Sequence, residues 1–232
     1  MSKSFAMTEN IAFIPIRKGS KGIPNKNIRI LGGKPLVCWV IDTLLSIPEI
    51  GSIWVSTDSE DAKKILLSRY GDKVGIFDRN PQNAGDTSPV IDAVIELIKS
   101  LNIASDRKLI LVQATSPFTS KDDFLKLLKT LRQDNADSYL SCRRVKRFVW
   151  SEDGVPLSYA MESKPMRQDY PGILVETGAF YASKVENILN SSQLLSGRIR
   201  IIETGPGTAI DIDEESDWKD AENYINNFGD GK

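Results

Sequence analysis

Short apolar runs alternate with amphipathic segments from residue 11 to about residue 143, and this alternation limits the fold more than any other feature. Buried strands are expected at 11–16, 52–56, 74–77, 108–113 and 138–143. Helices are expected at 35–47, from about 57 to 70, at 87–101 and from 120 onward. Thr57 with Glu60, and Ser120 with Asp123, have the form of capping boxes. The alternation predicts an α/β fold with a doubly wound, mostly parallel sheet.

The alternation stops near residue 144 and resumes near residue 179. Two apolar runs joined by Glu152-Asp153-Gly154 predict a hairpin within 148–159, and an irregular stretch follows to 172. Further elements are expected as a strand at 179–182, a helix from about 184, a strand at 199–202 and a helix at 214–227. We therefore expect one domain over 1–232 in which 144–172 is an inserted segment, because long excursions usually serve function or an interface.

Composition excludes several classes of protein. The formal net charge is −1, so nothing favours a nucleic-acid polymer or an anionic membrane as partner. No apolar run approaches the ~20 residues of a membrane helix, and the N-terminus lacks the pattern of a signal peptide. Cys38 and Cys142 have no metal-type spacing and suit reduced thiols in a cytoplasmic protein. The lack of histidine excludes His-based triads and His-ligated zinc.

A basic loop follows the first expected strand and reads RKGSKGIPNKN over residues 17–27. Its glycines allow a close approach of backbone to a ligand. Four cations could neutralise the phosphates of a nucleotide: Arg17, Lys18, Lys21 and Lys26. The loop matches neither the Walker A pattern nor the dinucleotide fingerprint. The alternative is a surface loop whose charge is incidental.

Two carboxylates near the C-terminus, Asp211 and Asp213, are separated by one isoleucine. On an extended segment they point to the same side and repel each other unless a divalent cation lies between them. Such oxygen ligands suit Mg²⁺ together with substrate phosphates. The alternative is an acidic helix start, which fits Glu214 and Glu215 better than it fits Asp211.

Three further stretches carry polar groups at expected strand ends or in loops. The run QATSPF begins at Gln113 and could bind a polyol or a base edge, or could be ordinary turn chemistry. Asp86 and Thr87 could contact a ligand or cap the next helix. Arg167 is a candidate carboxylate clamp, although a surface ion pair is the plainer interpretation, and Tyr181 ends the nearby run ETGAFY.

In combination, these stretches resemble the acylneuraminate cytidylyltransferase family, the CMP-sialic acid synthetases. The resemblance spans about residues 11–220 and rests on eight motifs in order: IPIRKGSKGIPNKN, GGKPL, VSTDSED, NAGDTS, LVQATSPF, MRQDYP, ETGAFY and DIDEESDW. It implies a nucleotide-diphospho-sugar transferase-like fold. It also implies that CTP and a nine-carbon 2-keto-3-deoxy sugar acid give the CMP-sugar and pyrophosphate, with Mg²⁺ as cofactor. A homodimer is implied, in which the segment at 144–172 exchanges contacts with the partner.

The resemblance also implies roles for individual residues. Arg17, Lys21, Lys26 and Asn27 fall on positions that bind CTP phosphates, and Asp86 and Thr87 lie beside the cytidine pocket. Gln113, Arg167 and Tyr181 fall on contacts to the sugar acid, and Asp211 and Asp213 fall on the metal ligands. Among these, the residues expected to act in catalysis are Arg17, Lys21 and Asp211.

Two departures from the family pattern lie near the expected sugar pocket. Ala114 stands where the family often has proline, and Thr177 and Phe180 alter the later motif, which often reads Asn-Gly-Ala-Ile-Tyr. They leave open the same chemistry on pseudaminic, legionaminic or ketodeoxynonulosonic acid or on Kdo. Another sugar nucleotidyltransferase activity and a nucleotide sensor without turnover are the competing functions.

Overall fold

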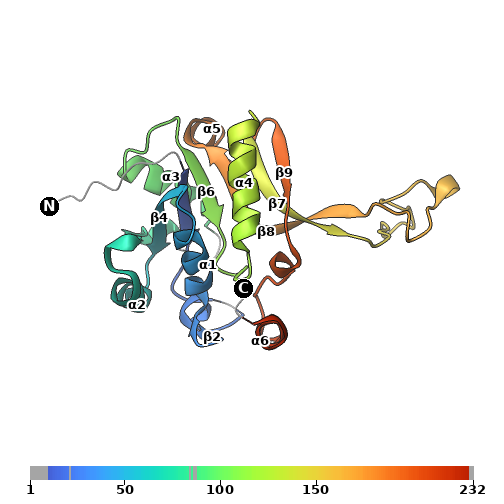
Figure 1. Ribbon diagram of the computed structural model, residues 1–232. Helices are drawn as coiled ribbons and strands as arrows, with labels where there is room; N and C mark the ends of the chain where they lie inside the picture. The colour runs from blue at the N-terminus through green and yellow to red at the C-terminus, as the bar shows by residue number, and fades with distance from the viewer. Residues whose placement is uncertain (1–9, 21, 84, 86–87, 230–232) are drawn as a thin grey trace.

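A seven-stranded sheet crosses the middle of the molecule in the order β5-β4-β1-β6-β8-β7-β9 (Figure 1). The structure is a computed structural model and describes residues 10–20, 22–83, 85 and 88–229. The strands of this sheet are β1 (Asn10–Pro15), β4 (Ile50–Thr57), β5 (Gly75–Asp78), β6 (Lys108–Val112), β7 (Ser138–Val145), β8 (Ile173–Lys184) and β9 (Ile199–Glu203). A separate small pair consists of β2 (Ile30–Leu31) and β3 (Lys34–Pro35).

Strand directions confirm the predicted mostly parallel sheet. Strands β1, β4, β5 and β6 are mutually parallel, and β7 is parallel to β9. Strand β8 runs antiparallel to both of its neighbours, β6 and β7. It is also longer than the predicted strand at 179–182, because its first half, from Ile173, pairs with the end of β7 beyond the body of the sheet.

Helices cover both faces of the sheet, as a doubly wound fold requires. They are α1 (Leu36–Leu45), α2 (Glu60–Tyr70), α3 (Val90–Ser100), α4 (Lys121–Gln133), α5 (Val185–Ser191) and α6 (Glu215–Phe228). One core cluster joins α1, α2 and α4 to the sheet, and a second joins α3 and α5 to the other face. No helix in the described ranges has both the length and the apolar character needed to cross a membrane.

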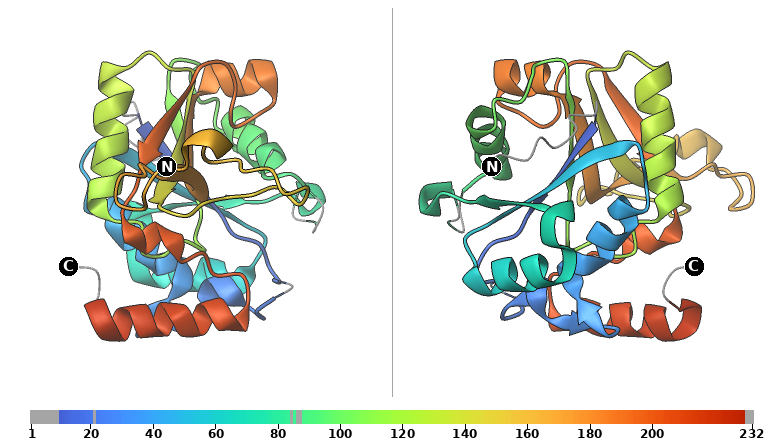
Figure 2. Two further views of the ribbon diagram at one scale, coloured as in Figure 1. Left: turned by 90° about the vertical axis from the view of Figure 1, so that its right-hand side faces the viewer. Right: turned by 60° about the vertical axis from the view of Figure 1, so that its left-hand side comes forward.

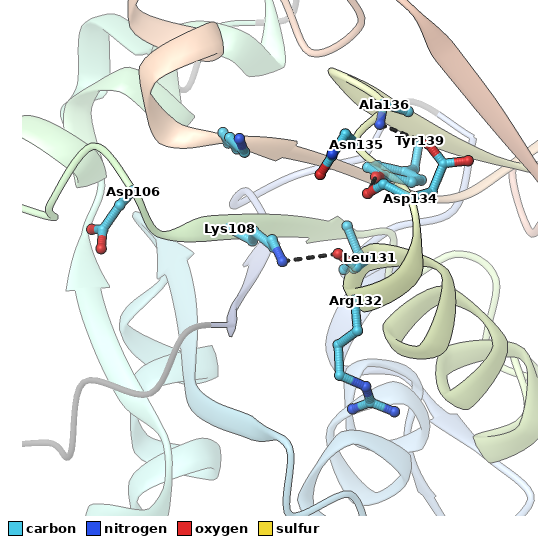
Figure 3. Close-up of a pocket in the computed structure, with 9 residues that line it drawn as sticks. Asp106, Lys108, Leu131, Arg132, Asp134, Asn135, Ala136 and Tyr139 are labelled. Atoms are coloured by element: carbon cyan, nitrogen blue, oxygen red, sulfur yellow. Dashed lines mark hydrogen bonds between the residues drawn. The ribbon is translucent and has the colours of Figure 1, made fainter.

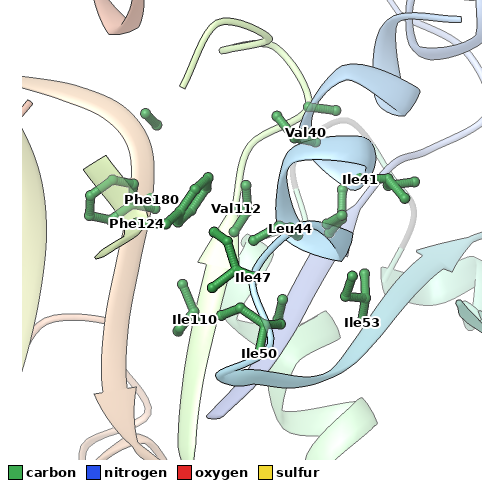
Figure 4. Packing of buried hydrophobic residues seen from close by; sticks show 14 of the residues in the cluster. Val40, Ile41, Leu44, Ile47, Ile50, Ile53, Ile110, Val112, Phe124 and Phe180 are labelled. Atoms are coloured by element: carbon green, nitrogen blue, oxygen red, sulfur yellow. The ribbon is translucent and has the colours of Figure 1, made fainter. Parts of the chain in front are cut away.

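The strand β1 shows why its sequence is a continuous apolar run. Ala12 and Ile14 belong to the first cluster, while Ile11 and Phe13 belong to the second, so successive side chains are buried on opposite faces. Figure 4 shows part of the first cluster, with Leu44 of α1 beside Val112 of β6.

A third cluster lies at the end of the sheet where α6 packs beside β2 and β3 (Figures 1 and 2). Its buried members come from the basic loop, β2, α1, the stretch between β6 and α4, and the segment from 210 onward: Ile23, Leu31, Leu36, Trp39, Phe118, Ile212, Trp218 and Ala221. The first and last parts of the chain are thus joined by a common apolar core.

Two predicted helix starts were wrong by a few residues. Ser59, not Thr57, caps α2, because Thr57 still pairs with Asp78 in the sheet and its hydroxyl accepts a hydrogen bond from the Ser59 amide. Helix α3 begins at Val90 with Pro89 at its N-cap, later than the predicted start at 87, while Asp86 and Thr87 lie outside the described residues. The predicted capping box of Ser120 and Asp123 is confirmed at the start of α4.

Between β7 and β8 the chain forms an arm, here defined as residues 146–172, that projects away from the sheet (Figure 1). The predicted hairpin is present, with Trp150 bridging Pro156. A small aromatic cluster gives the arm its own core: Phe148, Trp150, Tyr159 and Tyr170. Several large apolar side chains on the arm remain exposed: Trp150, Val155, Leu157, Met161 and Met166.

Candidate functional site

The carboxyl ends of four parallel strands meet at one edge of the sheet and form a polar cavity. Strands β1, β4, β5 and β6 end at Pro15, Thr57, Asp78 and Val112. A cavity of about 320 Å³ lies there and is lined by Pro15, Arg17, Gly19, Ser20, Lys26, Asn27, Arg79, Gly85, Ser88, Val90, Gln113, Thr115 and Asp213. Ligands of open α/β sheets bind in this position.

The basic loop bends back over the end of β4. The Lys18 amide donates a hydrogen bond to the Asp58 carboxylate at 2.6 Å, which fixes the start of the loop. Arg17, Lys26 and Asn27, all predicted to bind phosphate, line the cavity together. Lys21 lies outside the described residues, as do Asp86 and Thr87, although their neighbours Gly85 and Ser88 line the same cavity.

Lys26 links the basic loop to the acidic segment near the end of the chain. It is 7% exposed, and its Nζ donates to the Ile212 carbonyl at 2.6 Å and to Oδ1 of Asp213 at 2.9 Å. Gly22 lies so close to the Asp213 carbonyl that a Cβ there would collide with it. The loop therefore approaches the acidic segment through both a side chain and backbone.

Asp211 and Asp213 lie on an extended segment before α6, not within the helix. The Ile212 amide donates to the Thr115 carbonyl at 2.9 Å, and Ile212 is fully buried while both aspartates keep surface access. This alternation directs the two carboxyls away from the core. The helix itself is capped by Glu214, so the alternative of an acidic helix start accounts for Glu214 and Glu215 but not for Asp211.

The surroundings disfavour a charged Asp211. Although the residue keeps surface access, desolvation of its carboxyl raises the pKa, and the nearby charge of Asp213 raises it further. A hydrogen bond from Thr115 and the Lys26 cation act in the opposite direction. The pair thus carries the repulsion that a cation between the carboxylates would relieve.

Two carboxylates of this kind fit a magnesium ion that takes its other ligands from phosphate oxygens and water. Within the described part of the chain, no group of three or more His, Cys, Asp or Glu side chains could hold a metal by itself. A metal at Asp211 and Asp213 would therefore depend on the nucleotide to complete its coordination.

Two of the predicted sugar contacts lie near the acids. Gln113 lines the cavity, and its backbone N–H donates to the Ala179 carbonyl of β8 at 3.0 Å. The Tyr181 hydroxyl donates to Glu176. The pKa of Tyr181 is raised mainly by burial, then by this hydrogen bond, and to a smaller extent by the charge of Asp211. Tyr181 is therefore close enough to Asp211 for the carboxylate to raise the pKa of its hydroxyl.

Arg167 does not join this group. It is exposed on the arm and does not line the cavity. Since the arm projects away from the sheet, this chain's own fold leaves Arg167 outside the site that its motif predicts (Figure 1).

Sequence reasoning missed Arg79, which directly follows β5 and lines the cavity. Arg79 is 8% exposed, and its Nε has no hydrogen-bond partner in the described structure. Burial lowers the pKa of its guanidinium, which the charges of Asp58 and Glu96 partly offset. Its position just after an expected strand, at the edge where the other strands end, could have identified Arg79 from the sequence.

A larger cavity of about 480 Å³ lies at the opposite end of β6 (Figure 3). Its polar groups serve the neighbouring structure: Lys108 donates to the Leu131 carbonyl at the end of α4, and the Tyr139 hydroxyl donates to the Asp134 carbonyl. None of the predicted site residues lines it. The smaller cavity is therefore the candidate active site.

Comparison with known proteins agrees with this site. Residues 11–187 match the family described as Cytidylyltransferase. The chain is 33% identical to N-acylneuraminate cytidylyltransferase A of Danio rerio over 94% of its own length, and it spans about half (51%) of that relative. It is 28% identical to CMP-N,N'-diacetyllegionaminic acid synthase of Legionella pneumophila, with 90% of this chain and 92% of the relative covered.

A solved structure shares the fold across the whole chain. CMP:2-keto-3-deoxy-manno-octonic acid synthetase, solved with CTP, has a TM-score of 0.71 at 19% identity and covers 95% of this chain and 99% of its own. The sheet order, the strand-end cavity and the sequence match point to the same group of proteins. The chain belongs to the cytidylyltransferase family.

Proposed function

We propose that this chain transfers CMP from CTP to the anomeric hydroxyl of a nine-carbon, sialic acid-like 2-keto-3-deoxy sugar acid and releases pyrophosphate. One observation carries the proposal: Arg17 and Lys26 of the first loop line one cavity at the strand ends together with Asp213 of the last segment, and Asp211 lies two residues before Asp213 on the same extended stretch. A triphosphate needs the cations, and a divalent metal that accompanies it needs the acids.

The phosphates of CTP are held by the cations of the cavity. Arg17, Lys21 and Lys26 bind the leaving pyrophosphate, Asn27 contacts a phosphate, and Arg79 adds a buried positive charge. Asp86 and Thr87 belong to the nucleobase side. Fixed cations stabilise the negative charge that develops as pyrophosphate leaves, and they need no reorganisation during the step.

The sugar hydroxyl attacks the α-phosphorus in line, its proton passes to Asp211, and the bond to pyrophosphate breaks. Asp211 suits this role because desolvation raises the pKa of its carboxyl, which makes the carboxylate a stronger proton acceptor. Asp211 and Asp213 would hold Mg²⁺, which when bound offsets phosphate charge. Gln113 and Tyr181 orient the sugar acid beside these groups.

Arg167 reaches a site through a second copy of the chain. The arm carries Arg167 away from its own cavity and exposes apolar side chains, including Leu157 and Met166, that suit a protein interface. We infer a homodimer in which the arm of each subunit brings Arg167 to the partner's sugar acid, where its planar fork binds the carboxylate.

The names of the relatives limit which sugar acids are candidate substrates. Their names include an acylneuraminate enzyme, a diacetyllegionaminic acid synthase and, by structure, an eight-carbon 2-keto-3-deoxy acid synthetase. Sialic acid-like substrates come first because the acylneuraminate relative has the higher identity over most of this chain.

A pyrophosphate-release screen tests the function. The chain is incubated with Mg²⁺, CTP and each of a panel of eight- and nine-carbon keto-sugar acids, and then with UTP, GTP or ATP in place of CTP. Release that requires CTP and one acid supports the proposal and identifies the substrate. Binding of CTP by calorimetry, with no release for any acid, would instead identify a nucleotide sensor.

A further inference from the structure

The first turn of α6 contacts the stretch that follows the basic loop, although the two are far apart in sequence. The guanidinium of Arg29 lies over the Trp218 ring, 4.2 Å from its centre, and also forms an ion pair with Glu215. Trp218 is 1% exposed and belongs to the third core cluster, so it offers a fixed surface for Arg29. We call Arg29, Glu215 and Trp218 the α6 brace.

The same turn of α6 also holds the acidic segment. The Asp217 carboxylate accepts hydrogen bonds from the amides of Asp213 at 2.9 Å and Glu214 at 2.8 Å. Asp213 in turn accepts from Lys26. One helical turn therefore contacts the stretch directly after the cationic loop, through Arg29, and the segment that carries Asp211 and Asp213, through Asp217.

Arg29 is placed to act on Lys26 through a short, stiff connection. The 3₁₀ turn Lys26–Ile28 separates them, and the Arg29 amide bonds to the carbonyls of Asn25 and Lys26 at 3.0 and 3.2 Å. A displacement of Arg29 is thereby passed to the Lys26 backbone. Arg29 itself does not line the cavity, so it has no direct role with the nucleotide in the described site.

We propose that Arg29 is a positioning residue for the transfer of CMP from CTP: through the α6 brace it fixes the distance between the Lys26 ammonium and the Asp211 and Asp213 carboxylates. This inference rests on the proposed function and adds how the cationic loop and the acidic segment are held at a fixed distance from each other. Small displacements of groups that position a substrate have large effects on rate, which makes the role measurable.

The test compares Arg29→Met with Arg69→Met as a matched control. Arg69 also lies over an aromatic ring, that of Tyr70, and pairs with Asp42, but it lies on α2 and does not line the cavity. The arginine side chains are 36% and 43% exposed, so their removal should cost similar stability. Melting temperature, CTP affinity in EDTA by calorimetry, KM for CTP and the Mg²⁺ requirement are measured for each.

For Arg29→Met we expect about tenfold weaker CTP binding in EDTA, a similar rise in KM and a higher Mg²⁺ requirement. Its melting temperature should fall no more than that of Arg69→Met, and Arg29→Lys should recover part of the CTP affinity. Glu215→Gln, which removes the ion pair from the other side, should change the same quantities in the same direction.

Equal CTP affinity and Mg²⁺ requirement in Arg29→Met and Arg69→Met would overturn the positioning role of Arg29 while leaving the proposed function intact. Failure of the wild-type chain itself to bind CTP and release pyrophosphate would defeat the proposed function, and the positioning role would fall with it.

Discussion

At the scale of single residues, the candidate site combines groups that cost stability with groups that bind each other. Asp211 is desolvated beside a second carboxylate, and Arg79 is buried without a hydrogen-bond partner for its Nε in the described structure. Lys26 is satisfied by two strong acceptors. Unfavourable burial of this kind is typical of sites whose missing partner is a ligand.

Replacing Asp211 with asparagine tests its proposed role. We expect activity to fall by about 10²-fold or more at saturating Mg²⁺, since one oxygen ligand and the proton acceptor are lost. The melting temperature should hold or rise, because the change removes the repulsion with Asp213. Turnover within about threefold of wild type would exclude this role for Asp211.

Replacing Arg79 with methionine should weaken CTP binding without lowering the stability of the fold. The melting temperature should stay level or rise, because an apolar side chain of similar length replaces a desolvated charge. CTP affinity should weaken by about tenfold, because a charge-assisted contact is lost. Arg107→Met is the control: its Nε is also buried and has no hydrogen-bond partner in the described structure, with only the Asp106 carboxylate at 3.8 Å, but it lies outside the cavity. Equal CTP affinity in the two variants would count against a role for Arg79.

At the scale of elements, α6 depends on its first turn. Glu214 and Asp217 form a capping box, and hydrogen bonds from the Glu214 and Asp213 amides lower the pKa of Asp217. A carboxyl whose pKa is lower in the folded state stabilises the fold above its unfolded pKa. That stabilisation is lost as pH falls through the folded pKa.

Asp217→Asn should therefore lower stability by about 1 kcal/mol at neutral pH, the usual cost of a lost cap. The difference from wild type should be smaller at about pH 3, below the ordinary aspartate pKa of about 3.9, because falling pH progressively removes the stabilisation that the wild-type carboxylate provides. Urea unfolding at both pH values measures this, with the exposed α6 residue Asp220 changed to asparagine as the control. A difference independent of pH would show that the charge of Asp217 is not responsible.

The elements also show what the sequence could and could not predict. Lys26 stood out as one of four cations in a loop after a buried strand, and Asp211 and Asp213 stood out as carboxylates separated by one isoleucine. Arg79 did not, since one arginine after a strand resembles any surface arginine. Thr57 and Ser59 are both good caps, and only the pairing of Thr57 with Asp78 across the sheet decides between them. No local pattern reports such long-range pairing.

At the scale of the whole molecule, the arm projects from the sheet and exposes large apolar side chains. The sequence located the segment because the strand–helix alternation stops there. It did not reveal that β8 would extend from the sheet into the base of the arm, because a half-exposed strand such as Ile173–Gly178 lacks a continuous apolar run. Only the fold separates Arg167 from the cavity of its own chain.

Mixing two inactive variants tests whether Arg167 acts in a partner's site. Arg167→Ala and Asp211→Asn subunits, each inactive alone, should regain about one quarter of wild-type activity after unfolding and refolding together in equal amounts. The reason is that half of the dimers would be mixed, and each mixed dimer would hold one intact site. If both residues served the same chain's site, no activity would return.

The contact between Lys26 and Asp213 joins positions that are 187 residues apart in the sequence. During synthesis on a ribosome, the basic loop emerges first, and its acidic counterpart follows only 187 residues later. A chain released prematurely therefore has cations but lacks the carboxylates proposed for the reaction. Translation must pass Asp213 before the proposed site can form, so shorter products would not consume nucleotide.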